Sequence, residues 1–159
     1  MHMHLRFESA EQTTNFAERL SPCLTPGDVI LLHGNLGAGK THFARALIQS
    51  KMAEAGLRED VPSPTFTLVQ TYEFPDVQIW HADLYRLNGI DDVFELGLYD
   101  AFETDVCLVE WPDRLGDECP KDALNLTFEM TQTPGERLVT AQSNDPSWTA
   151  RVEQAAKHG

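Results

Sequence analysis

The sequence predicts an α/β fold in which helices cover both faces of a central, mostly parallel sheet, giving three layers. Two continuous apolar runs, 29–32 and 106–109, have the composition of strands that are buried on both faces. The first run leads into a glycine-rich stretch, 34–41, which a helix-forming stretch follows. Two alternating stretches, 124–130 and 137–141, predict an antiparallel hairpin towards the C-terminus.

Length and composition favour one globular domain over residues 1–159, with 42% hydrophobic and 23% charged residues. The formal net charge is -13, because 25 acidic residues face 12 Lys and Arg. This charge disfavours direct binding to nucleic acid and suits a partner with a basic face, although it could equally serve solubility alone. The three cysteines have no metal-ligand spacing, and no apolar run is long enough to span a membrane. We therefore expect a cytoplasmic protein without a membrane partner.

The stretch 34–41, here called the glycine loop, matches the pattern G-x-x-x-x-G-K-[ST] at every fixed position. Its glycines permit backbone angles that turn successive N–H groups inward around a phosphate, and the following helix adds its positive end. Lys40 is expected to reach the β- and γ-phosphates, and the Thr41 hydroxyl to bind Mg²⁺. The sequence therefore predicts a P-loop NTPase-like domain that binds a nucleoside triphosphate.

The elements around the loop follow from capping and periodicity. A helix is expected from Ser9, a candidate N-cap, to Leu20, and the helix after the glycine loop is expected to end near Ala55. Before the first of these helices, His2 and His4 are interpreted as part of a mobile end. Further strands are expected at 68–74, 77–83 and 106–110, short helices at 91–97 and 99–102, and a final helix at 148–157.

Two carboxylates come at the ends of predicted strands. Asp83 closes the strand 77–83, and Glu110 closes the apolar strand 106–110. Ligands collect at the carboxyl ends of parallel strands, so either acid could serve Mg²⁺ or an attacking water. Taken by themselves, Asp83 also fits a turn or cap, and Glu110 also fits an acid that begins a loop. Thr65 lies in a proline-constrained segment that reads either as a nucleotide-sensing loop or as a rigid connector.

Several motifs together give the chain a resemblance to a known family. In order and spacing it resembles the TsaE (YjeE) ATPases through five stretches: the glycine loop, Ser63-Pro64-Thr65-Phe66-Thr67-Leu68-Val69, His81-Ala82-Asp83-Leu84-Tyr85-Arg86-Leu87, Glu95-Leu96-Gly97-Leu98 and Val109-Glu110-Trp111-Pro112. The resemblance implies a small bacterial ATPase that acts with the proteins TsaB and TsaD in placing the threonylcarbamoyl group on adenosine 37 of tRNA. ATP hydrolysis would reset the partner complex, and tRNA would be met only through that complex.

The same resemblance implies roles for individual residues. Asp83 matches the family's Mg²⁺-associated aspartate, and Glu110 and Trp111 match its activity-linked pair. Thr65 falls in a switch-like segment, and Thr13 matches a nucleotide-proximal threonine. The expected nucleotide-binding set is Thr13, Asn35, Leu36, Gly37, Ala38, Gly39, Lys40 and Thr41; the expected Mg²⁺ set is Thr41, Asp83 and Glu110; the expected catalytic set is Lys40, Asp83 and Glu110.

Within this scheme we expect Thr41 and Asp83 on the Mg²⁺ side, with Glu110 polarising the water or standing just behind the metal. Arg86 and Arg114 lie beside the acidic motifs as candidate arginine fingers, but salt bridges explain them equally well, so slow intrinsic turnover is expected. Two alternatives stay open: a nucleotide-gated scaffold without catalysis, and a small-molecule P-loop kinase. A GTPase is disfavoured, because no N-K-x-D motif occurs.

Overall fold

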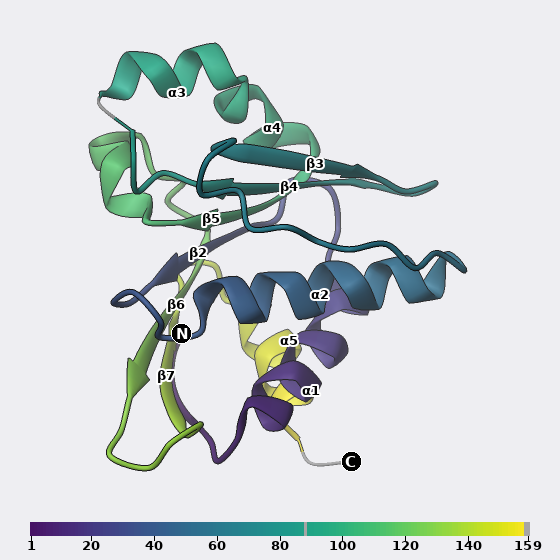
Figure 1. Ribbon diagram of the computed structural model, residues 1–159, viewed down its shortest axis with the longest axis vertical. Helices are drawn as coiled ribbons and strands as arrows, with labels where there is room; N and C mark the ends of the chain where they lie inside the picture. Colours follow the sequence, from purple (N-terminus) through teal and green to yellow (C-terminus); the bar gives the residue numbers. More distant parts are fainter. Residues whose placement is uncertain (88, 158–159) are drawn as a thin grey trace.

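The computed structural model describes residues 1–87 and 89–157, which contain one seven-stranded sheet flanked by helices (Figure 1). The strands are β1 (His2–Phe7), β2 (Val29–His33), β3 (Val69–Glu73), β4 (Gln78–Asp83), β5 (Val106–Glu110), β6 (Leu124–Met130) and β7 (Arg137–Gln142). The helices are α1 (Ala10–Leu20), α2 (Lys40–Glu54), α3 (Ile90–Leu96), α4 (Leu98–Thr104) and α5 (Ser147–Ala156), with 3₁₀ turns at Ser21–Cys23 and Pro112–Glu118. The predicted α/β class is thereby confirmed.

The sheet has the order β1-β7-β6-β2-β5-β4-β3. Its centre is parallel, since β2 pairs in parallel with β5 and β6, and β5 pairs in parallel with β4. The pairs β3–β4, β6–β7 and β1–β7 are antiparallel, so only β3 and β7 run against the other strands. The predicted hairpin at the C-terminal side is β6–β7. The glycine loop begins at the end of β2, which pairs with β5 on one side and with β6 on the other.

Alternate residues of β2 enter different hydrophobic clusters. Ile30 and Leu32 belong to the cluster that includes Phe43 and Leu47 of α2, whereas Leu31 belongs to the cluster that includes Leu98 of α4. Figure 1 shows α1, α2 and α5 grouped together, with α3 and α4 on the far side of β4 and β5. Burial on both faces explains why β2 and β5 read as unbroken apolar runs rather than as alternating ones.

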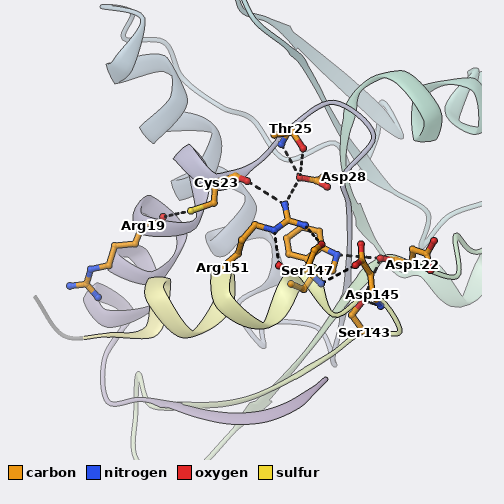
Figure 2. Close-up of polar contacts among 10 residues, drawn as sticks. Arg19, Cys23, Thr25, Asp28, Asp122, Ser143, Asp145, Ser147 and Arg151 are labelled. Carbon is orange, nitrogen blue, oxygen red and sulfur yellow. Dashed lines mark hydrogen bonds and ion pairs between the residues drawn. The ribbon is translucent and has the colours of Figure 1, made fainter.

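Helix α5 is tied to the turn that leads into β2 (Figure 2). Arg151 Nη1 donates to Asp28 Oδ2 at 2.6 Å and to the Cys23 carbonyl at 3.2 Å. The Arg151 guanidinium also lies 3.6 Å from the centroid of the Trp148 ring, and Trp148 is 1% exposed. Because Asp28 immediately precedes β2, this network fixes the root of the strand that carries the glycine loop.

The expectation of a mobile N-terminus is wrong. His2 and His4 lie in β1, which pairs along its whole length with β7, with His4 opposite Thr140. The reason is the alternation of the segment: Met3, Leu5 and Phe7 pack against the main core, while both histidines face outward and are exposed. The expected N-cap of α1 is confirmed, since the Gln12 backbone N–H donates to Ser9 Oγ at 3.2 Å.

Candidate functional site

The glycine loop joins the end of β2 to the start of α2, which confirms the predicted strand, loop and helix order. Gly34, Gly37 and Gly39 all have positive φ values, of 140°, 79° and 112°. At Gly34 the backbone also needs the space, because a Cβ there would lie 2.6 Å from the Phe128 carbonyl oxygen of β6. The loop is therefore shaped both by its own torsions and by close packing on a central strand.

A cavity of about 360 Å³ opens over the loop. It is lined by Ala10, Thr13, Leu36, Gly37, Gly39, Lys40, Thr41, His42, Thr65, Asp83, Glu110, Trp111, Gly135 and Arg137. All but two of the site residues predicted from the sequence are in this set. The two others, Asn35 and Ala38, lie on the opposite side of the loop, in a hollow against β6. The chain thus gathers residues from its first helix to its last strand around one space.

Two buried carboxylates stand side by side at the floor of the cavity. Asp83 ends β4 and Glu110 ends β5, and the parallel register places them opposite each other. They are 5% and 2% exposed. Thr41 donates its hydroxyl hydrogen to Glu110 Oε1 at 2.6 Å. The hydroxyl of the glycine loop therefore contacts Glu110 on the strand next to β2, rather than Asp83 one strand further away.

Asp83 has a different set of partners. Its Oδ2 accepts from the Thr65 hydroxyl at 3.2 Å, and its Oδ1 accepts from the Tyr85 backbone N–H at 3.0 Å. Thr65 therefore reaches the cavity from the segment before β3, whereas Thr67 is exposed and accepts a hydrogen bond from Gln70. The contact with Asp83 makes the Thr65 segment a part of the site as well as a connector.

The ammonium group of Lys40 is held between a carbonyl and an aromatic ring. Lys40 is 4% exposed, its Nζ donates to the Gly34 carbonyl at 2.6 Å, and it lies 3.4 Å from the centroid of the Trp111 ring. Burial lowers the pKa of Lys40 below its ordinary value, and the charges of Glu110 and Asp83 oppose this shift. Trp111 itself adopts a left-handed backbone conformation, with φ 57° and ψ 52°, which is costly for a bulky residue and is often found at functional sites.

Among the residues to which the sequence assigned no role, Arg137 and His81 make polar contacts with the groups of the site. Arg137, at the start of β7, donates from Nε to the Ala38 carbonyl at 2.7 Å and from Nη2 to the Gly37 carbonyl at 3.3 Å. His81, in the middle of β4, has its Nε2 2.7 Å from Glu110 Oε2. A signal for His81 was present, since strand alternation puts it on the same face as Asp83. No local pattern marks Arg137.

The two arginines that the sequence offered as candidate fingers lie elsewhere. Arg86 and Arg114 are exposed, and neither lines the cavity. The Arg86 guanidinium instead lies 4.8 Å from the centroid of the Phe66 ring. The arginine that the structure does bring to the glycine loop is Arg137.

The donor groups at the cavity floor fit Mg²⁺. The Thr41 hydroxyl and the carboxylates of Asp83 and Glu110 are hard oxygen ligands, which Mg²⁺ prefers. Within residues 1–87 and 89–157, no three His, Cys, Asp or Glu side chains form a metal site by themselves. The two carboxylates and the hydroxyl suit an ion that is commonly bound by one or two carboxylates together with substrate phosphates.

Comparison with known proteins shows the family. The sequence profile of "Threonylcarbamoyl adenosine biosynthesis protein TsaE" matches residues 7–139. The chain belongs to the TsaE family. It is 37% identical over 122 residues to the "tRNA threonylcarbamoyladenosine biosynthesis protein TsaE" of Rickettsia bellii, covering 77% of this chain and 83% of that protein. It is 30% identical over 154 residues to the Bacillus subtilis protein of the same name, covering 96% and 93%.

A solved structure agrees with this membership. The crystal structure of YdiB from Bacillus subtilis superposes with a TM-score of 0.75 at 26% identity, covering 98% of this chain and 94% of that one. The resemblance stated from the motifs is therefore confirmed over nearly the whole length. In the described part of the chain, no helix has both the length and the apolar character needed to cross a bilayer.

Proposed function

We propose that this TsaE-family chain is a Mg²⁺-dependent ATPase, one P-loop domain over residues 1–159. It would support threonylcarbamoylation of adenosine 37 in tRNA by acting with TsaB and TsaD and resetting their complex between turnovers. The observation that carries the proposal is the convergence of Lys40, Thr41, Asp83 and Glu110 in one cavity at the glycine loop, with Thr41 hydrogen-bonded to Glu110. This set supplies a cation, a hydroxyl and two carboxylates, the groups that phosphoryl transfer to water requires.

The phosphate end of the cavity is assigned to Lys40 and the glycine loop. The loop N–H groups and the start of α2 bind the phosphates, and the Lys40 ammonium turns from the Gly34 carbonyl to the terminal phosphates. Mg²⁺ would be held by Thr41 and Glu110, with Asp83 beside them, and when bound it neutralises charge on the phosphate oxygens. Because Thr41 contacts Glu110, we assign Glu110 to the Mg²⁺ site, in place of the Asp83 expected from the sequence. Asp83, which accepts from Thr65, is assigned to orienting the water.

The part of the cavity beside α1 is assigned to the nucleoside. Thr13 of α1 lines it, is 2% exposed, and has a hydroxyl without a hydrogen-bond partner among the described residues. A buried hydroxyl without a partner is costly, and a nucleotide group would satisfy it. Gly135, in the turn between β6 and β7, borders the same part of the cavity, since a Cβ on it would lie 3.9 Å from the Ala10 backbone nitrogen. These contacts support the assignment of Thr13 as nucleotide-binding.

A nucleotide-gated scaffold is the second candidate. It is favoured by the contacts of Arg137, which lines the cavity but donates from Nε and Nη2 to loop carbonyls. Without an arginine on the transferring phosphate, bound ATP is hydrolysed slowly, so that ATP binding alone would drive assembly with a partner. Trp111, whose ring contacts both the Lys40 ammonium and the tilted Tyr85 ring, is the residue through which we expect a bound partner to act on the phosphate end.

The proposed partners are proteins in the cytoplasm, and tRNA is reached through them. A net charge of -13 repels the phosphate backbone of RNA and also disfavours binding to acidic proteins. TsaB and TsaD would therefore offer basic surface to this chain.

The test is release of phosphate from ATP with and without TsaB and TsaD, measured beside the yield of modified tRNA. The ATPase proposal expects slow release alone, faster release with both partners, and continued tRNA modification only while ATP is hydrolysed. Modification that continues over many turnovers with a non-hydrolysable ATP analogue would instead establish the scaffold. A phosphorylated small molecule among the products would establish a kinase.

A further inference from the structure

His81 is a buried polar residue at the centre of the site floor. It lies in β4 between the half-buried Trp80 and the buried Ala82, and is 0% exposed. Its Nε2 is 2.7 Å from Glu110 Oε2, while Glu110 Oε1 accepts from Thr41 at 2.6 Å. The three side chains form one chain of hydrogen bonds that runs from the glycine loop through the carboxylate into the sheet.

The other ring nitrogen of His81 decides how the ring is protonated. Nδ1 is buried and has no hydrogen-bond partner in the described part of the chain. A proton on Nδ1 would be a buried donor without an acceptor, which costs more than a bare lone pair in the same place. The ring therefore carries its proton on Nε2, which donates to Glu110.

We propose that His81 is a positioning residue for Glu110. Its Nε2–H holds Oε2, so that Oε1 is fixed in line with the Thr41 hydroxyl. A carboxylate held at both oxygens keeps a single orientation, whereas one held by Thr41 alone can rotate about its terminal bond. His81 touches neither nucleotide nor metal in this scheme, and acts only through Glu110.

The effect on turnover rests on the proposed ATPase function, so the test begins there. His81→Gln and His81→Asn carry the same amide, but only the longer Gln can place an N–H donor near the position of Nε2. We expect His81→Asn to lower kcat about 10- to 100-fold and to change the Kd for ATP by less than about threefold. His81→Gln should recover most of the lost kcat. Equal losses in both variants, or no loss in either, would overturn the proposal.

A matched control separates positioning from loss of stability. Trp80 is the neighbouring residue of β4, and its Nε1 donates to Asp105 at 2.8 Å on the other face of the sheet. Trp80→Phe removes one hydrogen bond from the same strand without touching Glu110. It should lower the melting temperature and leave kcat unchanged. A fall in kcat in Trp80→Phe as large as in His81→Asn would mean that strand stability alone explains the effect.

A second readout needs no activity, and so separates this inference from the proposed function. In ¹⁵N-histidine-labelled wild-type protein, the His81 signals, assigned by their loss in His81→Gln, should show a proton on Nε2 and none on Nδ1. A protonated Nδ1 would overturn the inference even if the protein hydrolyses ATP. If the wild-type protein does not hydrolyse ATP but shows the expected protonation, the ATPase proposal fails while the His81–Glu110 contact stands.

Discussion

Substitution of the first loop glycine should destabilise the protein far more than substitution of the second. In Gly34→Ala, the new Cβ would lie 2.6 Å from the Phe128 carbonyl oxygen and 3.2 Å from the Ala38 Cβ. The Phe128 backbone is fixed, because Phe128 pairs with Val139 of β7 and the preceding residue, Thr127, pairs with His33 of β2. At Gly37, by contrast, nothing lies within 4 Å of the new Cβ.

The magnitudes follow from two costs. Both positions have positive φ, and an alanine held there costs about 1–2 kcal/mol. Gly34→Ala adds the cost of forcing a side chain against fixed backbone, typically about 1–3 kcal/mol or more. We therefore expect Gly34→Ala to lose about 2–5 kcal/mol of unfolding free energy and Gly37→Ala about 1–2 kcal/mol. For a chain of this size the extra cost lowers Tm by about 2–4 °C per kcal/mol.

Urea unfolding followed by circular dichroism measures both variants against wild type. The midpoint of Gly34→Ala should lie well below that of Gly37→Ala, with similar slopes. Equal midpoints, or a lower midpoint for Gly37→Ala, would refute the packing of the glycine loop on β6.

Three further predictions concern the site and its support. Glu110→Gln should bind ATP near the wild-type Kd and hydrolyse it about 100-fold more slowly, because the amide cannot accept hydrogen bonds from both Thr41 and His81 as the carboxylate does. Phosphate release at the wild-type rate would remove Glu110 from the mechanism. Arg137→Ala should weaken ATP binding about tenfold or more, since two hydrogen bonds that hold the loop carbonyls are lost. Arg151→Ala, the control at α5, should lower stability and leave the Kd for ATP unchanged, and equal Kd changes for the two variants in calorimetry would contradict this. The hydrogen bond from Arg6 lowers the pKa of Glu136, so the stabilisation from this pair is present above the ordinary pKa of 4.5 and is lost as the pH falls below that value. Glu136→Gln should therefore flatten the fall in urea midpoint between about pH 6 and pH 3.5. An unchanged pH profile would exclude the Arg6–Glu136 pair as a cause of the fall.

Local patterns were sufficient for the glycine loop and its flanking elements. The apolar run of β2, the three glycines and the helix formers after Lys40 are all encoded within a few residues, so their structure does not depend on distant partners. Asp83 and Glu110 could also be placed together in advance, because the carboxyl ends of parallel strands share one edge of a sheet.

Long-range placement could not be predicted in the same way. Whether Thr41 meets Asp83 or Glu110 depends on strand order, and β5 rather than β4 lies beside β2. Arg137 donates to the Ala38 carbonyl, 99 residues earlier in the chain, and lies on the β6–β7 hairpin. No local pattern predicts where this hairpin joins the sheet. The strand β1 escaped prediction for a different reason: its alternation was visible, but a short terminal segment gains its structure only by pairing with β7.

The central claim is that Lys40 and its neighbours bind and hydrolyse ATP to serve the partner complex. The most direct test is the rate of phosphate release from ATP in the presence of Mg²⁺, TsaB and TsaD, for wild type and for Lys40→Ala. The account predicts partner-stimulated release by wild type and a loss of about 100-fold or more in Lys40→Ala, since removing the cation leaves the developing phosphate charge uncompensated. Equal rates in the two proteins would contradict it.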